Sequence, residues 1–295
     1  MSSDFRPYRR TRNEPQSPIE YFADLSFGRR VGLARHFSLK NWPAIIAVLV
    51  IFTLTAIVVL WAAWSITGLE FDRFGRLRQR NTAFSPELSL ILAILLLLGA
   101  AIAFIYAGIG LNVLALRGAA NKPTGVLDSL LAPLSVQPVG IFLSLLLWGV
   151  IDCGIQIALR FTMLIPFIEL PVVCIYAMLI TWLTLVIYFY LADCASRGRR
   201  FRVTETVSKP LRLFFGDFGL WLGTILFLIV LSLPPTVLLS YSAYAFFTDR
   251  GQMALIALGL GLALGLPAGV FAIFMNAVTY KQAKARLILR QRGFR

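Results

Sequence analysis

The chain has 295 residues, of which 58% are hydrophobic and 14% are charged, and its mean hydropathy is +0.78. A soluble domain of this length cannot bury so much apolar surface, so the composition predicts a polytopic membrane protein. The formal net charge of +14 would suggest nucleic acid as a partner in a soluble protein, but here the basic residues flank apolar runs. Anionic phospholipid is the simpler partner, and nucleic acid is not expected.

The first 20 residues are polar and carry several prolines, so we expect a disordered tail over 1–20. We expect no cleavable signal peptide, because the first long apolar run begins only near Trp42. Between Ile19 and Lys40, apolar and basic residues interleave as in a helix lying in the headgroup layer. A solvated basic linker is the alternative for that stretch.

Six apolar runs are long enough to cross a hydrocarbon layer of roughly 30 Å as helices. The fold class that we expect is therefore all-α, a bundle of six transmembrane helices with interfacial amphipathic segments, forming one membrane domain over 21–282 and followed by a basic tail over 283–295. Pro234-Pro235 in the fifth run predicts a kink or an early helix end. The expected spans are 42–64, 88–116, 139–162, 168–192, 218–239 and 254–278.

Basic residues are unevenly divided between the two sides of a six-span chain. The N-terminal segment, the regions 117–122 and 197–212, and the C-terminal segment from Lys281 together hold 22 of the 28 Lys and Arg. The loop 67–85 holds 4 of the others. The positive-inside rule therefore places both termini in the cytoplasm.

An 80-residue internal repeat is indicated by the order of segments. Residues 86–151 align without a gap on 166–231, which places Arg117-Gly118 on Arg197-Gly198, although only 10 of 66 columns are identical. In each copy an apolar run, a short amphipathic segment and a second apolar run follow one another. We interpret this order as repeated units, each an amphipathic surface segment followed by a helical hairpin.

The surface segments carry the residues expected to contact lipid headgroups. Each basic side chain near an anionic membrane contributes on the order of 1 kcal/mol to binding. Pro210 argues against one uninterrupted helix in the segment 203–217. The predicted headgroup contacts are Arg29, Arg30, Arg35, Arg197, Arg199, Arg200, Arg202, Lys209 and Arg212.

The sixth span has small residues at four-residue spacing, which lets another helix approach closely. This stripe favours either ordinary packing inside the bundle or a dimer or gate surface. Its members are Ala257, Gly261, Gly265 and Gly269.

The sequence offers few groups for chemistry. Sequence motifs typical of hydrolases, phosphate loops and dinucleotide sites are missing, and the three cysteines and one histidine have no metal-ligand spacing, so we expect no catalytic residue, metal or cofactor. Asp193 and Arg197 form an i, i+4 pair that we interpret as structural.

The exception is a polar face in the third span, made by Asp152, Gln156 and Arg160 at four-residue spacing. A charge at the bilayer centre costs roughly 2.5 to 3.5 kcal/mol on insertion scales, so this face should point into the bundle. Asp152 is then either protonated or paired with a polar group on another helix, fixing the helix register, or it binds a proton or substrate on a transport path.

The stretch from Arg202 to Gly223 resembles the segment before the fifth span in a broad group of bacterial six-helix membrane proteins, and Ala277 to Arg286 is similar to their ending. That group includes uncharacterised proteins and the membrane region attached to some glycerophosphodiester phosphodiesterases. The resemblance extends over residues 25–290 and implies a membrane-embedded helical module, which we expect in the inner (plasma) membrane of a bacterium. It implies no phosphodiesterase activity, since the catalytic domain does not follow in this chain.

Three classes of function remain after these observations. The first is a non-enzymatic membrane scaffold or partner- or lipid-binding module, working with a membrane protein partner or as a homo-oligomer. The second is a small-molecule or lipid transporter, suggested by internal repetition and proline-broken spans. The third, an enzyme, is least favoured by the missing motifs.

Overall fold

The structure is a computed structural model that describes residues 17–67, 69–71, 77–79, 85–122, 125–162, 169–248 and 250–293. Most of the predicted disordered tail and much of the loop 67–85 lie outside these ranges. For Arg160 the structure describes the backbone but not the side chain, so its predicted place on the polar face lies outside the description. The elements are α1 (Pro18–Ala23), α2 (Phe27–Thr67), β1 (Leu69–Phe71), β2 (Leu77–Gln79), α3 (Pro86–Gly118), α4 (Val126–Val136), α5 (Pro138–Thr162), α6 (Glu169–Ser196), α7 (Glu205–Gly216), α8 (Phe218–Phe247) and α9 (Gly251–Gln291).

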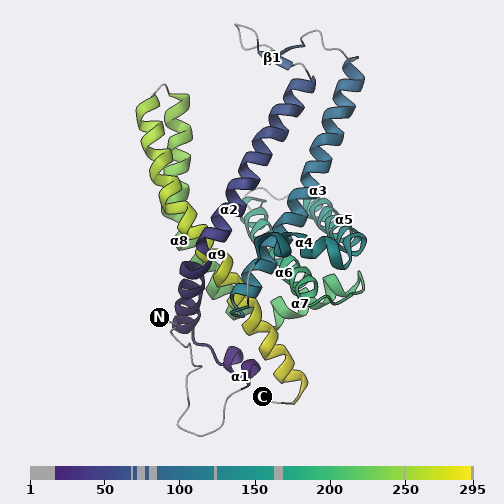
Figure 1. Cartoon of the computed structure of the whole chain (residues 1–295), viewed down its shortest axis with the longest axis vertical. Coiled ribbons are helices and arrows are strands. Elements are labelled where there is room, and N and C mark those ends of the chain that lie inside the picture. The colour runs from purple at the N-terminus through teal and green to yellow at the C-terminus, as the bar shows by residue number, and fades with distance from the viewer. Residues whose placement is uncertain are drawn as a thin grey trace.

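The protein is an all-α, multi-pass membrane protein, as its composition predicts. Six helices in the described part of the chain, α2, α3, α5, α6, α8 and α9, are long and apolar enough to cross a membrane. The two strands form only a short antiparallel pair between α2 and α3. Helices α2 and α3 make one long hairpin and α8 and α9 another, and the two hairpins diverge from a common base (Figure 1).

Several helices are longer than the sequence predicts. Helix α2 includes the part of the predicted surface segment from Phe27 to Lys40 and continues through Pro43. Helix α8 continues past Pro234-Pro235 to Phe247, so of the two alternatives predicted there, the early helix end is wrong. Helix α7 likewise contains Pro210, whose side chain is buried. A proline removes one backbone N–H, and packing on both sides of it can hold the helix together, as is common in membrane helices.

The residues expected to form a basic C-terminal tail are mostly helical. Helix α9 extends well beyond residue 278 and ends at Gln291. Its last turns lie against other elements: Gln282 donates to the main-chain oxygen of Leu25 at 2.7 Å, and Arg290 donates to Asp217 at 2.8 Å. Lys284 is paired with Asp193 at the end of α6. These contacts explain why the segment is ordered despite its charge.

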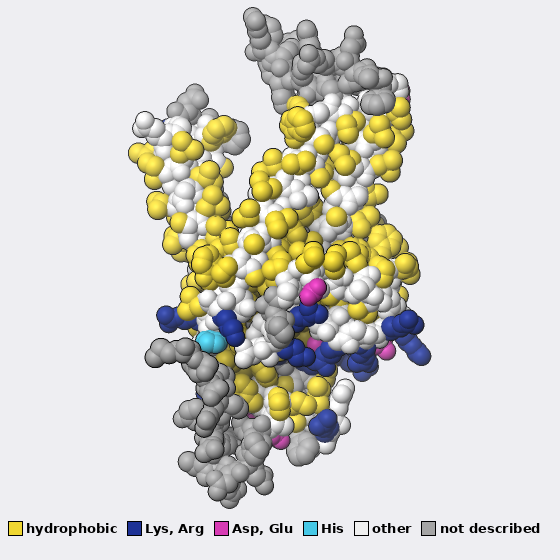
Figure 2. Space-filling view, viewed as in Figure 1, with side chains coloured by type: hydrophobic (Ala, Val, Ile, Leu, Met, Phe, Trp, Pro, Cys, Tyr) yellow, Lys and Arg dark blue, Asp and Glu magenta, His cyan; other side chains and the backbone are white. Residues whose placement is uncertain are grey.

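The best-packed part of the molecule lies at this same base. The largest fully buried side chains there include Trp221, Phe189, Phe214, Phe274 and Tyr280, each less than 2% exposed. Phe189 stacks on Tyr280 with ring centroids 5.8 Å apart. Toward the far ends of the hairpins most apolar side chains are exposed instead, which suits contact with lipid tails (Figure 2). The hairpins are therefore held together mainly at one end of their length.

Candidate functional site

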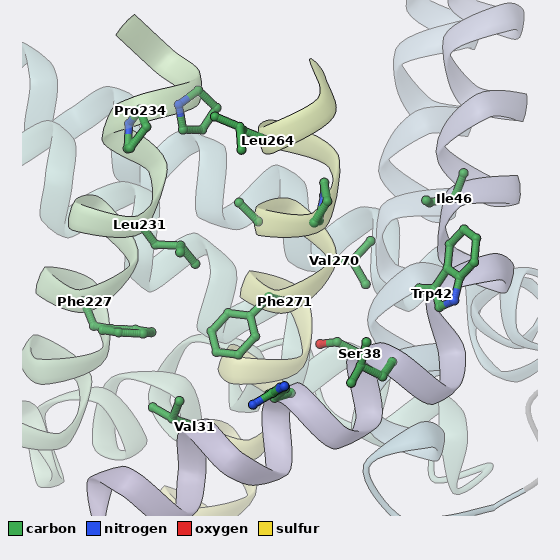
Figure 3. Close-up of a pocket in the computed structure, with 15 residues that line it drawn as sticks. Val31, Ser38, Trp42, Ile46, Phe227, Leu231, Pro234, Leu264, Val270 and Phe271 are labelled. Carbon is green, nitrogen blue, oxygen red and sulfur yellow. The ribbon is translucent and has the colours of Figure 1, made fainter. Parts of the chain in front are cut away.

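A groove of about 740 Å³ lies where α2 meets the α8–α9 hairpin. Its walls are almost wholly apolar, with Phe227 and Leu231 from α8, Val270 and Phe271 from α9, and Trp42 from α2 (Figure 3). Volumes of roughly 300 to 1,000 Å³ are typical of small-molecule sites in proteins. The groove is thus large enough to hold a substantial apolar ligand.

The α2 wall follows from the helical period of its sequence. Val31, Arg35, Ser38, Trp42 and Ile46 recur at spacings of three and four residues, so they share one face of the helix. The opposite wall includes three prolines and a leucine from the two antiparallel helices of the hairpin, Pro234, Pro235, Leu264 and Pro267. In Figure 3, Pro234 and Leu264 lie at the end away from Val31.

The Val31 end of the groove is its polar end. Arg35 lines the groove there, is exposed, and has no hydrogen bond or ion pair with any of the described residues. Ser38 donates its hydroxyl proton to the main-chain oxygen of Ala34 at 2.6 Å, so it is not a free donor for a ligand. Trp42 is 50% exposed, and its indole N–H has no hydrogen-bond partner within the described ranges. The groove therefore combines a cationic end with apolar walls.

Basic side chains form a band across the molecule below the diverging apolar hairpins (Figure 2). Of the predicted headgroup residues, Lys209 is engaged with Glu205 at 2.5 Å; the hydrogen bond lowers the pKa of the Glu205 carboxyl. The exposed members are Arg29, Arg35, Arg197, Arg199, Arg200, Arg202 and Arg212.

Arg30 does not fit the headgroup role predicted for it. Its side chain is only 5% exposed and donates to the hydroxyl of Thr224 on α8 at 2.9 Å. Thr224 in turn lies 3.1 Å from the hydroxyl of Thr279 on α9. The helical period that exposes Arg29 turns its neighbour inward, so Arg30 joins three helices instead of contacting lipid.

The polar face of the third span is organised around Asp152. Tyr176 of α6 donates its hydroxyl proton to one carboxyl oxygen of Asp152, and Gln156 donates to the other at 2.9 Å. The same tyrosine hydroxyl lies 3.2 Å from the main-chain oxygen of Asp152. Asp152 is half-buried, but Gln156 is exposed, so the face does not point wholly into the bundle. Among the described elements, α5 contacts mainly α4, α6 and α7, and most of its residues are exposed.

The small-residue stripe of the sixth span packs mainly against α8. A Cβ atom added at Gly261 would lie 2.9 Å from the Leu239 side chain, and one at Gly265 would lie 3.5 Å from Pro235. Ala257 is buried, whereas Gly269 is exposed, with open space beside it. The stripe thus serves the close approach of the two helices of one hairpin over most of its length.

Comparison of the chain with protein-family models, curated proteins and solved structures finds no match.

Sequence reasoning did not find the groove or the role of Tyr176. The groove joins residues of α2 to residues some 200 positions later, and no local pattern reports such a meeting. A signal was present for α2, because Arg35, Ser38 and Trp42 interrupt or border an apolar face at helical spacing. For Tyr176 the only signal was that an intramembrane carboxyl needs a polar partner on a neighbouring helix.

Proposed function

We propose that the protein is a non-enzymatic module of the bacterial inner membrane that binds anionic lipids and holds partner proteins. The observation that carries this proposal is the position of the basic band, which lies at the base of two apolar hairpins that diverge and leave most of their surface exposed (Figures 1 and 2). A basic band of this kind attracts anionic headgroups. Exposed apolar helix faces are available to lipid tails or to helices of a partner or a second copy.

The internal repeat supports a scaffold built from similar units. Helix α4 ends at Val136 and α7 at Gly216, which are 80 residues apart. The helices that follow them, α5 and α8, begin at Pro138 and Phe218, also 80 residues apart, as in the sequence alignment. Each of these units is a short amphipathic helix followed by a hairpin. Such units would place several basic surface segments on one side of the membrane.

The test of the proposed function is photo-crosslinking in native membranes. Photoreactive residues at exposed positions such as Val58 of α2 and Val230 of α8 should yield a reproducible protein or lipid adduct. Purification of the unlabelled protein in a mild detergent should retain anionic phospholipid. If neither a partner nor a bound lipid is found under these conditions, the proposed function is wrong.

The orientation gives a separate prediction. With the basic band in the cytoplasm, Ser85 at the start of α3 lies on the outer side of the membrane. A Ser85→Cys variant, made in a background without the native cysteines, should react with a membrane-impermeant maleimide in intact spheroplasts. A cysteine at Arg200, in the opposite basic region, should react only after permeabilisation. The reverse pattern would place the termini outside.

A transporter is the second candidate, favoured by the cluster of Asp152, Gln156 and Tyr176 within the membrane. A carboxyl group at that depth is costly unless it is protonated or paired, and in transporters such groups often bind protons or ions. Our proposal assigns this cluster to the pairing of α5 with α6.

Replacing Asp152 by Asn keeps the shape and an acceptor for Tyr176 but removes the titratable group. We therefore expect the Asp152→Asn variant to fold and to retain the same crosslinked partners and lipids as the unaltered protein. Asp128→Asn, which changes an exposed carboxyl outside the spans, is the matched control. If Asp152→Asn folds normally but loses the protein's activity in cells, and Asp128→Asn keeps that activity, the transporter is favoured.

A further inference from the structure

We infer that the groove between α2 and the α8–α9 hairpin binds one anionic phospholipid, with the phosphate at Arg35 and the acyl chains along the apolar walls. This inference rests on the proposed function and names the ligand of one site within it. It differs from general attraction to an anionic surface, because it requires a defined place for both the headgroup and the tails.

The first step of the argument is the position of Arg35. It is the one cation that lines the groove, and in the described part of the chain it has no anionic partner. A guanidinium group can donate two parallel hydrogen bonds to a phosphate, and such pairs are stronger than hydrogen bonds between neutral groups. The nearby Ser38 hydroxyl is already bonded to Ala34, so Arg35 supplies the charge that selects an anionic headgroup.

The second step is the order of residues along the groove. Arg35 and Val31 lie toward the N-terminal end of α2, next to the basic band, whereas Ile46 lies about 16 Å further along the helix axis by the helical rise. The walls between these ends are apolar, with Leu231 on α8, Val270 and Phe271 on α9, and Trp42 and Ile46 on α2 (Figure 3). A phospholipid has this same order of charge and hydrocarbon along its length.

The third step concerns Trp42, which separates the polar end of the groove from the apolar walls. Tryptophan is enriched at the level of the headgroups because one edge of its indole donates a hydrogen bond and the rest is apolar. Its N–H, unpaired with any described residue, can donate to an ester carbonyl of a lipid seated in the groove. A helix of a partner protein could pack against the apolar walls, but its apolar side chains would provide no anion for Arg35.

The experiment uses the full-length protein, stripped of lipid and returned to micelles with either phosphatidylglycerol or phosphatidylcholine. Native mass spectrometry then counts bound lipids. We expect one tightly retained phosphatidylglycerol and a preference over phosphatidylcholine that falls about fivefold in Arg35→Gln, the factor that corresponds to about 1 kcal/mol for one basic residue near an anionic headgroup. Arg200→Gln, which removes an exposed charge that does not line the groove, should keep the preference.

A second pair of variants tests the acyl-chain part of the site. Ala268 lines the groove on α9, so Ala268→Phe should fill it and abolish the retained lipid. Ala263→Phe adds the same bulk at an exposed position of α9 that does not line the groove, and should have no effect. Because Ala268→Phe could also misfold, phosphatidylglycerol with a photoreactive acyl chain should label groove residues of α2, α8 or α9 in the unaltered protein.

Three results would overturn this inference. Equal loss of preference in Arg35→Gln and Arg200→Gln would mean that only the overall charge matters. Labels confined to helices away from the groove would place the lipid elsewhere, and a crosslink from groove positions to a protein helix would identify a partner or a second copy as the occupant. In each of these cases the proposed function survives, whereas it fails if native membranes yield neither lipid nor partner.

Discussion

Replacing Gly110 by alanine should destabilise the protein by about 2 kcal/mol or more, because the added methyl group would meet backbone atoms of α4. A Cβ at Gly110 would lie 2.6 Å from the Cα atom of Leu130 and 3.0 Å from the main-chain oxygen of Ser129. Backbone atoms cannot rotate away as a side chain can, so α4 as a whole would have to move off α3. Such movement would also disturb Ser129, which is fully buried and within 3.4 Å of the Arg117 guanidinium.

The matched control is Gly108→Ala on the same helix. A Cβ at Gly108 would have nothing within 4 Å, and alanine is favoured over glycine in helices by roughly 1 kcal/mol, so this variant should be unchanged or slightly more stable. Unfolding by sodium dodecyl sulfate in mixed micelles compares the two variants. Hydrogen exchange should show faster exchange in α4 for Gly110→Ala alone. Equal stability of the two variants would contradict the close approach of α3 and α4.

The sequence predicted the fold where the physical signal was local. A transmembrane helix must satisfy its own backbone hydrogen bonds, so its length and apolar character can be seen directly in the run of residues. All six predicted spans lie largely within six helices of the structure. Amphipathic periodicity likewise indicated the surface segment that forms α7, whose buried face includes Leu213 and Phe214, although the interruption predicted at Pro210 is wrong.

The sequence failed where long-range contacts decide the outcome. The helical continuation of α9 beyond residue 278 depends on contacts with Ala23, Leu25, Asp193 and Asp217, which lie on three distant segments of the chain. From the charge pattern alone we predicted a basic tail over 283–295, because a run rich in basic residues is typical of a solvated segment. The same limit applies to Arg30, whose buried partner Thr224 is 194 residues away. Of the residues that line the groove, only Arg35 was given a binding role from the sequence.

Removing the charge of Asp193 should loosen the end of α9 from α6. The Asp193 side chain is 12% exposed, and it is paired with Lys284 of α9 as well as with Arg197, one turn further along, at 3.0 Å. The Arg197 side chain is 61% exposed, and such surface pairs contribute little, so Lys284 is the partner that matters. An Asp193→Asn variant leaves the ammonium group of Lys284, itself 26% exposed, without its counter-charge.

We expect Asp193→Asn to lower the free energy of unfolding by about 1 to 3 kcal/mol, less than the 3 to 5 kcal/mol typical of a broken, fully buried pair, because water reaches Lys284 in part. Glu205→Gln is the matched control, since Glu205 pairs with Lys209 one turn away on the same helix and both side chains are about one-third exposed, so it should cause little measurable change. A double-mutant cycle with Lys284→Met isolates the coupling between Asp193 and Lys284. If that coupling is zero, the end of α9 is held by its contacts with α1 and with Asp217, and the ion pair with α6 contributes nothing to the base of the bundle.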